Sequence, residues 1–511
     1  MVVQKIFTAT LIGIEAALVE VEADVSNGLP ATIIVGLPDT AVQESRERVR
    51  SAIKHSGFSY PQTRVSLNLA PGGLPKVGTH FDLPIALAIL SASGILQSSV
   101  NLNKSLFVGE LSLDGTIKTT PGILAMVQLA KQRGFDSVFV PTENALMASL
   151  VDGITVFPLN TLNELTQHLQ GKNQEGDQIK PMPSYRNIKI PNNFNFDFSE
   201  IAGQQYAKRA LEIAAAGGHN ILLTGPPGSG KTMLAKALPS IMSPLEKEEI
   251  LELTKIYNSS GKLNSGIISC RPFRSPHHTA SSIALIGGGG IPRPGEVTLA
   301  HHGVLFLDEF PEFSRTSLEV LRQPLEDNSI TITRSRHAYT FPASFILVAA
   351  QNPCPCGNFG QVLNNAKLEC NCHPTAIQRY KKKISGPLLD RIDLHITVPR
   401  LAYKEISIAE KTNESESAKI QKRVVQARAV QTTRFGKPQT NHEMSAKQLR
   451  ESCKLNDECE NFLEQAANKY QLSGRTIHRV QKVARTIADL EKSKNIELSH
   501  LAESLQYRLR E

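Results

Sequence analysis

A short apolar stretch that leads into a glycine-rich loop constrains this chain most. Residues 221–224 (Ile-Leu-Leu-Thr) predict a strand, and residues 233–238 predict a helix. The motif G-x-x-x-x-G-K-T lies between them and comprises Gly225, Pro226, Pro227, Gly228, Ser229, Gly230, Lys231 and Thr232. In such a loop, backbone N–H groups bind phosphate oxygens, the lysine adds positive charge, and the threonine hydroxyl can bind Mg²⁺. The sequence therefore predicts an α/β fold that binds Mg-ATP or Mg-GTP.

A second apolar stretch ends in two carboxylates. Residues 304–307 (Val-Leu-Phe-Leu) predict a strand buried on both faces, and Asp308 and Glu309 follow it directly. In a Walker B strand of this kind, Asp308 would hold Mg²⁺ and Glu309 would polarise the attacking water. The alternative is a strand followed by a solvated acidic turn. The phosphate-binding loop upstream favours the catalytic interpretation.

Length and charge indicate the broad class of protein. A chain of 511 residues has room for about three domains, and its 41% hydrophobic and 20% charged residues are typical of a globular protein. The formal net charge of +8 permits an anionic partner such as nucleic acid without requiring one. The first residues alternate like a strand rather than a signal peptide, and no apolar run approaches the roughly 20 residues that cross a bilayer. We therefore expect a cytoplasmic protein without a membrane partner.

Changes in composition divide the chain into four parts. Residues 1–165 alternate strands with helices: residues 31–35 predict a strand, 40–56 an amphipathic helix and 81–92 a buried helix. Residues 166–195 become polar and rich in proline and asparagine, which predicts a linker. Residues 196–400 contain the nucleotide motifs. Residues 401–511 have helical periodicity without a strand signal, which predicts a helical lid.

Four of the seven cysteines form two close pairs, Cys354 with Cys356 and Cys370 with Cys372. Four thiolates at this spacing are enough for a tetrahedral Zn²⁺ site that is closed to water and therefore structural. In a reducing cytosol, clustered cysteines favour a metal over disulfides. Free cysteines, a redox pair, or His373 in place of one thiol are the alternatives. We expect a zinc-binding insertion at residues 354–372.

With these motifs in place, the chain resembles the YifB/ComM family of magnesium-chelatase-like AAA+ ATPases over nearly its whole length. The strings that carry the resemblance are G-L-P-D-T-A-V-Q-E-S-R-E-R-V (36–49), F-D-L-P-I-A-L-A (81–88), R-P-F-R-S-P-H-H-T-A-S (271–281), G-E-V-T-L-A-H-H-G-V-L-F-L-D-E (295–309), A-Q-N-P-C-P-C-G (350–357) and S-G-P-L-L-D-R-I-D (385–393). The resemblance implies an ATP-driven homo-hexameric ring with an AAA+ P-loop core and a helical lid. It also implies a DNA branch-migration helicase of natural transformation, with branched or single-stranded DNA and other recombination proteins as partners.

The resemblance extends to the residues around the nucleotide. Asn352, after the apolar strand expected at residues 344–350, is similar to sensor 1, an amide that can bind the γ-phosphate or the attacking water. An ordinary Asn-Pro turn is the alternative. Residues 201–204 (Ile-Ala-Gly-Gln) resemble the segment that lies against adenine, which favours ATP over GTP by analogy.

Two arginines resemble residues that sense the γ-phosphate. Arg391 is similar to the arginine finger, whose guanidinium enters the neighbouring subunit's site and neutralises charge in the transition state. An intrachain pair with Asp390 or Asp393 is the alternative. Arg475 matches the sensor 2 position, which contacts the γ-phosphate from its own subunit; Arg479 is the second choice, and a solvated helix face is the alternative.

A basic hairpin is the first candidate DNA contact. Residues 329–341 alternate β-forming residues around a tip that carries Arg334 and Arg336. They resemble the pre-sensor-1 hairpin of helicase-type AAA+ proteins, whose tips line a central pore where cations can meet phosphates. A solvated basic tip is the alternative.

Two further segments could lie near the pore. Lys381, Lys382 and Lys383 follow the cysteine pairs and are a second candidate DNA surface. Residues 287–295 contain four consecutive glycines and Arg293. We expect them not to pack in a core, so a mobile pore loop and a plain surface linker are equal alternatives.

Part of the first domain resembles the α+β proteolytic domain of Lon, without its chemistry. Residues 108–124 match the segment that ends with Lon's catalytic lysine, and the matching residue is Leu124. Residues 76–81 match the region of the nucleophilic serine, where His80 stands. A Ser-Lys dyad needs a hydroxyl and an amine within hydrogen-bond reach. We therefore expect an inactive protease-like domain that serves assembly or DNA contact.

These observations rank four functions. A hexameric ATP-driven DNA translocase leads. A chelatase-type ATPase that acts on a protein or a tetrapyrrole-metal system follows, because the chain has neither a long acidic linker nor an integrin-like domain. A Lon-like protease would need a displaced dyad such as Thr79 with Lys118. Glu309 argues against a nucleotide-switched scaffold, which would not need a carboxylate that activates water.

Overall fold

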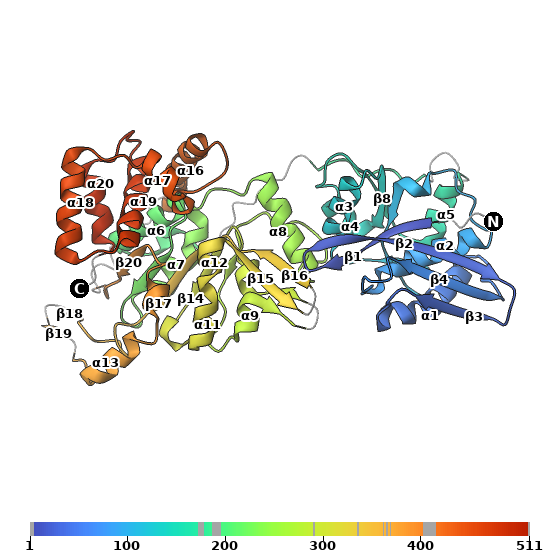
Figure 1. Cartoon of the computed structure of the whole chain (residues 1–511), viewed down its shortest axis with the longest axis horizontal. Coiled ribbons are helices and arrows are strands. Elements are labelled where there is room, and N and C mark those ends of the chain that lie inside the picture. The colour runs from blue at the N-terminus through green and yellow to red at the C-terminus, as the bar shows by residue number, and fades with distance from the viewer. Residues whose placement is uncertain are drawn as a thin grey trace. The chain divides into compact units, whose positions relative to one another are not determined.

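The computed structural model describes residues 5–171, 178–185, 196–289, 292–334, 337–360, 362–363, 366–367, 369–401 and 415–508. The chain forms two compact units, both of mixed α/β structure (Figure 1). The first unit comprises Met1–Lys189 and Glu246–Ser269, and the second comprises Ile190–Leu245 and Cys270–Glu511. Among the helices that the structure describes, none is both long and apolar enough to span a lipid bilayer.

The first unit is built on a seven-stranded mixed sheet in the order β3-β4-β2-β1-β5-β8-β9. Strand β1 pairs antiparallel with β2, and β2 pairs antiparallel with β4, whereas β8 runs parallel to both β5 and β9. The strand and the two helices expected between residues 31 and 92 are present. The elements are β1 (Lys5–Ile12), β2 (Glu15–Ser26), β3 (Ala31–Val35), α1 (Thr40–His55), β4 (Arg64–Ala70), α2 (Asp82–Ala92), β5 (Ser105–Phe107), β6 (Glu110–Leu111), β7 (Ile117–Lys118), α3 (Ile123–Gln132), β8 (Ser137–Pro141), α4 (Thr142–Ala148), β9 (Thr155–Leu159) and α5 (Leu162–Gln170).

Helix α8 (Lys247–Ser259) completes the first unit, although in sequence it lies within residues 196–400. The side chain of Lys255 pairs with Glu15 of β2 at 2.6 Å. Asn258 Oδ1 accepts the backbone N–H of Leu124 at 3.5 Å. Leu251 packs with the apolar residues of α3 and α4, and so do Leu263 and Ile267 beyond the helix. Residues 246–269 therefore cover the start of α3.

The second unit is built on a five-stranded parallel sheet in the order β11-β14-β17-β10-β20. Strands β10, β14 and β17 consist almost wholly of buried apolar residues, as expected when helices cover both faces of a parallel sheet. The elements are α6 (Gln205–Gly217), β10 (Ile221–Thr224), α7 (Lys231–Ile241), β11 (Phe273–Arg274), α9 (Ser282–Ile286), β12 (Gly287–Gly288), β13 (Arg293–Pro294), α10 (Glu296–Leu299), β14 (Val304–Leu307), α11 (Arg315–Glu319), α12 (Pro324–Asp327), β15 (Ser329–Arg334), β16 (His337–Pro342), β17 (Ile346–Gln351), β18 (Val362–Leu363), β19 (Ala366–Lys367), α13 (Pro374–Lys381), α14 (Gly386–Leu389) and β20 (Leu394–Thr397).

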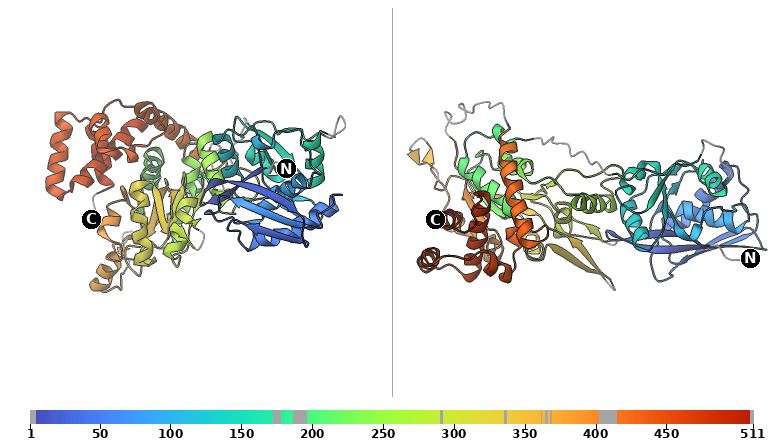
Figure 2. Two further views of the ribbon diagram at one scale, coloured as in Figure 1. Left: turned by 45° about the vertical axis from the view of Figure 1, so that its right-hand side comes forward. Right: turned by 90° about the horizontal axis from the view of Figure 1, so that it is seen from above.

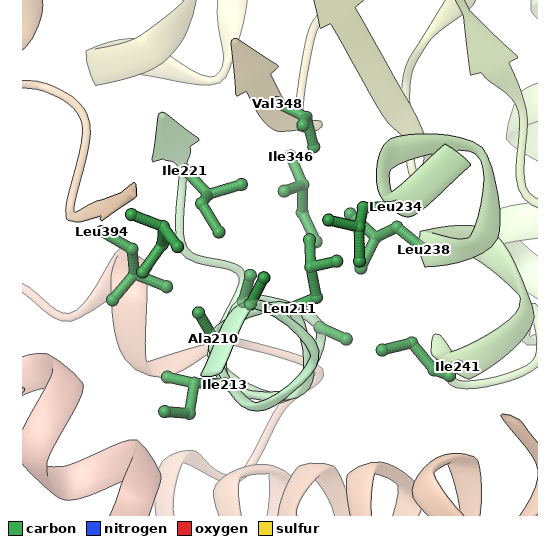
Figure 3. Packing of buried hydrophobic residues seen from close by; sticks show 14 of the residues in the cluster. Ala210, Leu211, Ile213, Ile221, Leu234, Leu238, Ile241, Ile346, Val348 and Leu394 are labelled. Atoms are coloured by element: carbon green, nitrogen blue, oxygen red, sulfur yellow. The ribbon is translucent and has the colours of Figure 1, made fainter. Parts of the chain in front are cut away.

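The core of this unit lies between the sheet and helices α6 and α7. Its members are almost completely buried, and burial of each large side chain contributes about 1.5–3 kcal/mol to stability. Figure 3 shows the strand and helix side chains that meet there: Ala210, Leu211, Ile213, Ile221, Leu234, Leu238, Ile241, Ile346, Val348 and Leu394. This packing fixes the start of α7 at the end of β10.

Residues 415–508 are helical, as their periodicity predicts. The helices are α16 (Glu416–Phe435), α17 (Ala446–Ser452), α18 (Asp457–Tyr470), α19 (Gly474–Leu490) and α20 (Leu498–Gln506). They lie together in both views of Figure 2, and α16 and α19 pack against α6. Residues 402–414, near the start of the predicted helical part 401–511, lie outside the described residues.

A buried carboxylate ties the C-terminal helices to the sheet. Asp393, directly before β20, accepts hydrogen bonds from His219 (3.1 Å), His442 (2.7 Å) and Arg479 of α19 (2.7 Å). Burial raises the pKa of Asp393, but His442, Arg479 and His219 outweigh that effect and hold the pKa well below its ordinary value. The carboxylate is therefore charged at neutral pH and organises three elements around itself.

We predict that Asp393→Asn destabilises the second unit by about 3–5 kcal/mol, because it removes the buried negative charge with which Arg479, His442 and His219 pair. Because the folded-state pKa is depressed, the contribution of Asp393 is present above the unfolded pKa of about 3.9 and is lost only as the pH falls below it. Urea midpoints followed by circular dichroism measure the change. The control is Asp390→Asn, whose half-exposed side chain should cost about 0.5 kcal/mol or less. Equal midpoints for the two variants would contradict this role.

Candidate nucleotide-binding site

The glycine-rich loop joins the end of β10 to the start of α7, as the sequence predicts. Gly228 and Gly230 have φ of 74° and 89°, in the left-handed region that glycine enters without strain. A cleft of about 430 Å³ opens at the loop. Its lining consists of Pro227, Gly228, Ser229, Gly230, Lys231, Thr232, Met233, Asp308, Glu309, Gln351 and Asn352. The predicted loop, Walker B and sensor 1 residues thus meet at one place.

Lys231 is held at the base of the cleft by its own loop. Its Nζ donates to the carbonyl oxygens of Gly225 (2.7 Å) and Pro226 (2.9 Å), and it lies 3.4 Å from Asn352 Oδ1. Burial lowers the pKa of Lys231, while the charge of Asp308 opposes that change. The ammonium group can exchange these neutral acceptors for phosphate oxygens with little movement.

The oxygens expected to bind Mg²⁺ lie side by side. Thr232 Oγ1 donates to Asp308 Oδ2 at 3.0 Å, and the N–H of Glu309 donates to Asp308 Oδ1 at 2.9 Å. A hydroxyl and a carboxylate are hard oxygen ligands, which Mg²⁺ prefers, and the ion usually retains several waters and phosphate oxygens. The residues present therefore fit a Mg-nucleotide.

Glu309 has a strained backbone and a partner that the sequence analysis did not identify. Its φ is 50°, which is unusual for a residue with a side chain and is often found at functional positions. Its Oε2 lies 3.2 Å from Nδ1 of His278, and the His278 ring packs against that of His277 at a centroid distance of 4.1 Å. His278 belongs to the string R-P-F-R-S-P-H-H-T-A-S (271–281), to which the sequence pattern alone assigns no role. Only the tertiary fold reveals its contact with Glu309.

Gln204 braces the glycine loop from outside. Its Nε2 donates to the carbonyl oxygens of Pro399 (2.7 Å) and Ser229 (3.3 Å). Its φ is 54°, at the start of α6. The segment expected to lie near adenine therefore contacts the loop directly.

The two predicted arginines lie in a second cavity. Arg391, Arg475, Glu326 and Arg479 are among the residues that line a cavity of about 340 Å³, and neither predicted arginine lines the cleft at the glycine loop. Arg391 is 6% exposed and pairs with Glu326 rather than with Asp390 or Asp393. Its Nη1 donates to the carbonyl of Pro387 at 2.6 Å, while its Nε has no hydrogen-bond partner among the described residues. Arg475 is exposed at the start of α19.

The four clustered cysteines converge, as expected for a metal site. All four sulfur atoms lie within 4.8 Å of one another, and Cys354, Cys356 and Cys370 are separated by 3.3–3.7 Å. A tetrahedral zinc–thiolate site has Zn–S bonds of about 2.3 Å and therefore sulfur atoms about 3.8 Å apart. The backbone N–H of Asn358, followed by the Cys354 thiol, lowers the pKa of Cys356, which favours the thiolate form that binds metal. At Cys370 and Cys372, a backbone hydrogen bond lowers the pKa, but burial and the neighbouring cysteines outweigh it and raise the pKa, so a bound metal ion would be what holds all four as thiolates. The cluster fits Zn²⁺.

The structure describes only part of the segments that we expect to contact DNA. Strands β15 and β16 form the predicted antiparallel hairpin. Arg336 lies outside the described residues, and Arg334 is described only for its backbone. Lys383 pairs with Glu312 at 2.7 Å, and Lys381 lies over the Phe359 ring at 5.7 Å from its centroid.

The glycine-rich segment differs from our expectation that it does not pack. Gly287 is buried, and β12 pairs with β13. A Cβ on Gly287 would lie 2.3 Å from the carbonyl oxygen of Arg293. Glycine allows the two strands to approach each other closely at this position. Gly290 and Ile291 lie outside the described residues.

The two positions that we matched to Lon's dyad are both buried. His80 is 4% exposed, its Nε2 bonds the carbonyl of Ala9 at 2.8 Å, and burial lowers its pKa to about 4. Leu124 is completely buried. The Thr79 hydroxyl, considered for a displaced dyad, donates to the carboxylate of Glu110, and Lys118 lies opposite Glu110 in the β6–β7 pair.

Comparisons with known proteins match this organisation. Residues 197–406 match the family described as "Magnesium chelatase, subunit ChlI", residues 21–144 match "Subunit ChlI of Mg-chelatase", and residues 414–508 match "Magnesium chelatase, subunit ChlI C-terminal". A weaker similarity, 26% identity over 248 residues, connects 42% of this chain with 44% of Lon protease 2 of Bacillus subtilis.

Two relatives match over almost their entire length. The chain is 42% identical to the competence protein ComM of Haemophilus influenzae over 510 residues, which cover 98% of this chain and 97% of ComM. It is 41% identical to YifB of Escherichia coli over 507 residues, which cover 98% of this chain and 96% of YifB. The chain therefore belongs to the YifB/ComM family of magnesium-chelatase-like AAA+ proteins.

Proposed function

We propose that this protein is a ring-forming ATPase that translocates DNA and promotes branch migration in recombination during natural transformation. The observation that carries the ATPase part is the cleft where Lys231 and Thr232 meet Asp308, Glu309 and Asn352. Together these side chains provide a cation for the phosphates, two ligands for magnesium, a carboxylate that polarises water, and an amide. Phosphoryl transfer depends on positioning and charge stabilisation of this kind.

The roles follow from the contacts. Lys231 neutralises the β- and γ-phosphates, and Thr232 with Asp308 holds Mg²⁺, which compensates phosphate charge when bound. Glu309 orients and polarises the attacking water, and Asn352 binds that water or the γ-phosphate. The bond of Glu309 to His278 gives the carboxylate a defined resting position.

We predict different defects for two changes in the cleft. Lys231→Ala should weaken ATP binding, because it removes the cation at the phosphates. Glu309→Gln should bind ATP normally but hydrolyse it at least about 100-fold more slowly, because an amide cannot act as the base. Equilibrium binding of a fluorescent ATP analogue and steady-state ATPase rates measure the two effects. Wild-type hydrolysis by Glu309→Gln would exclude the Walker B assignment.

The second cavity supports a site shared between subunits. Arg391 is almost fully buried, yet its Nε lacks a partner among the described residues, and Arg475 lines the same cavity. Guanidinium groups in such a cavity suit a terminal phosphate. We infer that both serve the nucleotide bound to a neighbouring copy in a hexamer, rather than Arg475 serving its own subunit.

We predict that Arg391→Ala binds ATP but hydrolyses it about 10³-fold more slowly. Mixing this variant with Lys231→Ala protein should restore activity, since mixed rings contain interfaces with an intact Arg391 facing an intact Lys231. In the matched control, Arg391→Ala protein is mixed with Glu326→Ala protein, and we expect no rescue. Glu326 is the ion-pair partner of Arg391 in the same subunit, so both changes affect the same side of the shared site. No rescue in rings shown by mass spectrometry to be mixed would place Arg391 in its own subunit's site.

Translocation of DNA is supported by the relative's name and by charge. A competence protein is the relative at 42% identity, and the net charge of this chain is +8. The β15–β16 hairpin follows the Walker B strand, and Arg334 is the last residue of β15. Arg336, which we expect at the tip from the sequence, lies outside the described residues. Contacts from such a tip to phosphates would bind DNA in a salt-dependent manner with little sequence preference.

We predict that a four-way DNA junction stimulates the ATPase and is migrated by the protein. Arg334→Ala with Arg336→Ala should abolish both effects and leave basal hydrolysis intact. The control, Lys422→Ala with Lys447→Ala, removes the same charge from exposed positions on the C-terminal helices and should retain both effects. Unchanged migration by the hairpin variant would move the DNA path to the Lys381–Lys383 region. Absence of any DNA response would favour a chelatase-type ATPase that acts on a protein or tetrapyrrole-metal partner.

Structural zinc is part of the same proposal, and the convergence of four thiols supports it. We predict about one zinc per chain in protein purified under reducing conditions, because a four-thiolate site has no open position through which the ion exchanges readily. Cys354→Ser with Cys372→Ser should lose the metal, and Cys270→Ser, outside the cluster, should retain it. Plasma mass spectrometry of the purified proteins measures the content. A wild-type zinc content near zero would remove zinc from the proposal.

A further inference from the structure

The cysteine cluster begins immediately beside the nucleotide cleft. Cys354 is only two residues beyond Asn352, which lines that cleft, and it is completely buried. The N–H of Gly357 donates to the Cys354 carbonyl at 3.0 Å, and the N–H of Phe359 lies 3.3 Å from Cys354 Sγ. The loop therefore folds back tightly around the first cysteine.

This turn of the loop contacts the phosphate-binding loop. Gly357 is buried with φ of 83°, and a Cβ built on it would lie 2.4 Å from Cδ and 3.1 Å from Cγ of Pro227. Cβ atoms do not approach other heavy atoms within 3.0 Å, so the backbone of Gly357 lies against the Pro227 ring with no room for a side chain. Pro227 itself lines the nucleotide cleft.

The other end of the cluster reaches the same cleft through α13. This helix begins two residues after Cys372, and its Tyr380 is 7% exposed. Burial raises the pKa of Tyr380 to about 12, and the nearby backbone of Asn352 opposes that increase. The two cysteine pairs thus connect the turn that packs against Pro227 with the helix whose Tyr380 lies near Asn352.

We propose that the metal bound by the four cysteines is a brace for the nucleotide site, which holds Pro227 and Asn352 in the positions that ATP requires. Loss of the metal releases the turn at residues 354–357 and helix α13 and thereby weakens nucleotide binding. The cluster therefore makes ATP binding depend on metal availability. This inference rests on the proposed ATP and zinc sites and adds a direct physical link between them.

Two glycines of this loop provide a matched test. Gly357 and Gly360 both have positive φ (83° and 72°), so alanine strains the backbone at either position. Only the new methyl group at residue 357 meets Pro227, because a Cβ at residue 360 has no heavy atom within 4 Å. Gly357→Ala should retain its zinc but bind a fluorescent ATP analogue about tenfold more weakly. Gly360→Ala should match the wild type in both measurements.

A double variant tests whether the contact between residues 357 and 227, rather than a general loss of structure, causes the weaker binding. Pro227→Ala creates room for a methyl group at residue 357, so Pro227→Ala with Gly357→Ala should bind the analogue more tightly than the product of the two single effects predicts. In parallel, wild-type protein stripped of zinc with a mercurial and a chelator should lose affinity for the analogue while its circular dichroism is retained. Added Zn²⁺ under reducing conditions should restore the affinity.

The outcomes separate this inference from the proposed function. Unchanged affinity of both Gly357→Ala and zinc-stripped protein for the analogue would overturn the brace and leave the ATPase proposal intact. The same conclusion would follow if wild-type protein purified without zinc bound the analogue tightly. Failure of zinc-loaded wild-type protein to bind any nucleotide would instead overturn the proposed function, and the brace with it.

Discussion

The pairing of β10 with β17 on one side and β20 on the other determines where chemistry can occur in the second unit. Both pairs are parallel, with Thr224 opposite Gln351 on one side and Thr397 on the other. Strand β14 joins the same register through β17. Carboxyl ends of parallel strands meet at one edge of a sheet, which is where open α/β sheets bind ligands. The glycine loop, the two acidic residues and Asn352 follow these strands directly, so the pairing of the strands brings the parts of the cleft together.

The features predicted correctly from sequence are local in the chain. The strand before Gly225, the apolar strand before Asp308, the hairpin at residues 329–341 and the helical C-terminal part each carry their signal within a few residues. Periodicity and turn chemistry act over that distance, and covalent spacing alone was enough to suggest that the cysteine pairs meet.

Features that depend on tertiary partners could not be predicted. Arg391 pairs with Glu326, which lies 65 positions away, whereas the sequence suggests only its neighbours Asp390 and Asp393 as partners. The contact of His278 with Glu309 is also nonlocal. Gly287 and Arg293 are close in sequence, but they pack together only because β12 pairs with β13, which composition does not reveal. Glycine composition indicates conformational freedom, but whether that freedom serves mobility or close packing depends on what lies across from the residue.

The placement of α8 has a consequence for dissecting this protein. The chain passes from one unit to the other three times, after residues 189, 245 and 269, so the boundary between the units is not a single cut site. A shortened chain that starts at residue 196 would keep α8 but lose the residues on which Leu251, Leu263 and Ile267 pack. It would expose that apolar surface to water, which favours self-association. To produce the second unit alone, residues 246–269 should be replaced by a short polar linker. To produce the first unit alone, residues 246–269 should be joined to residues 1–189.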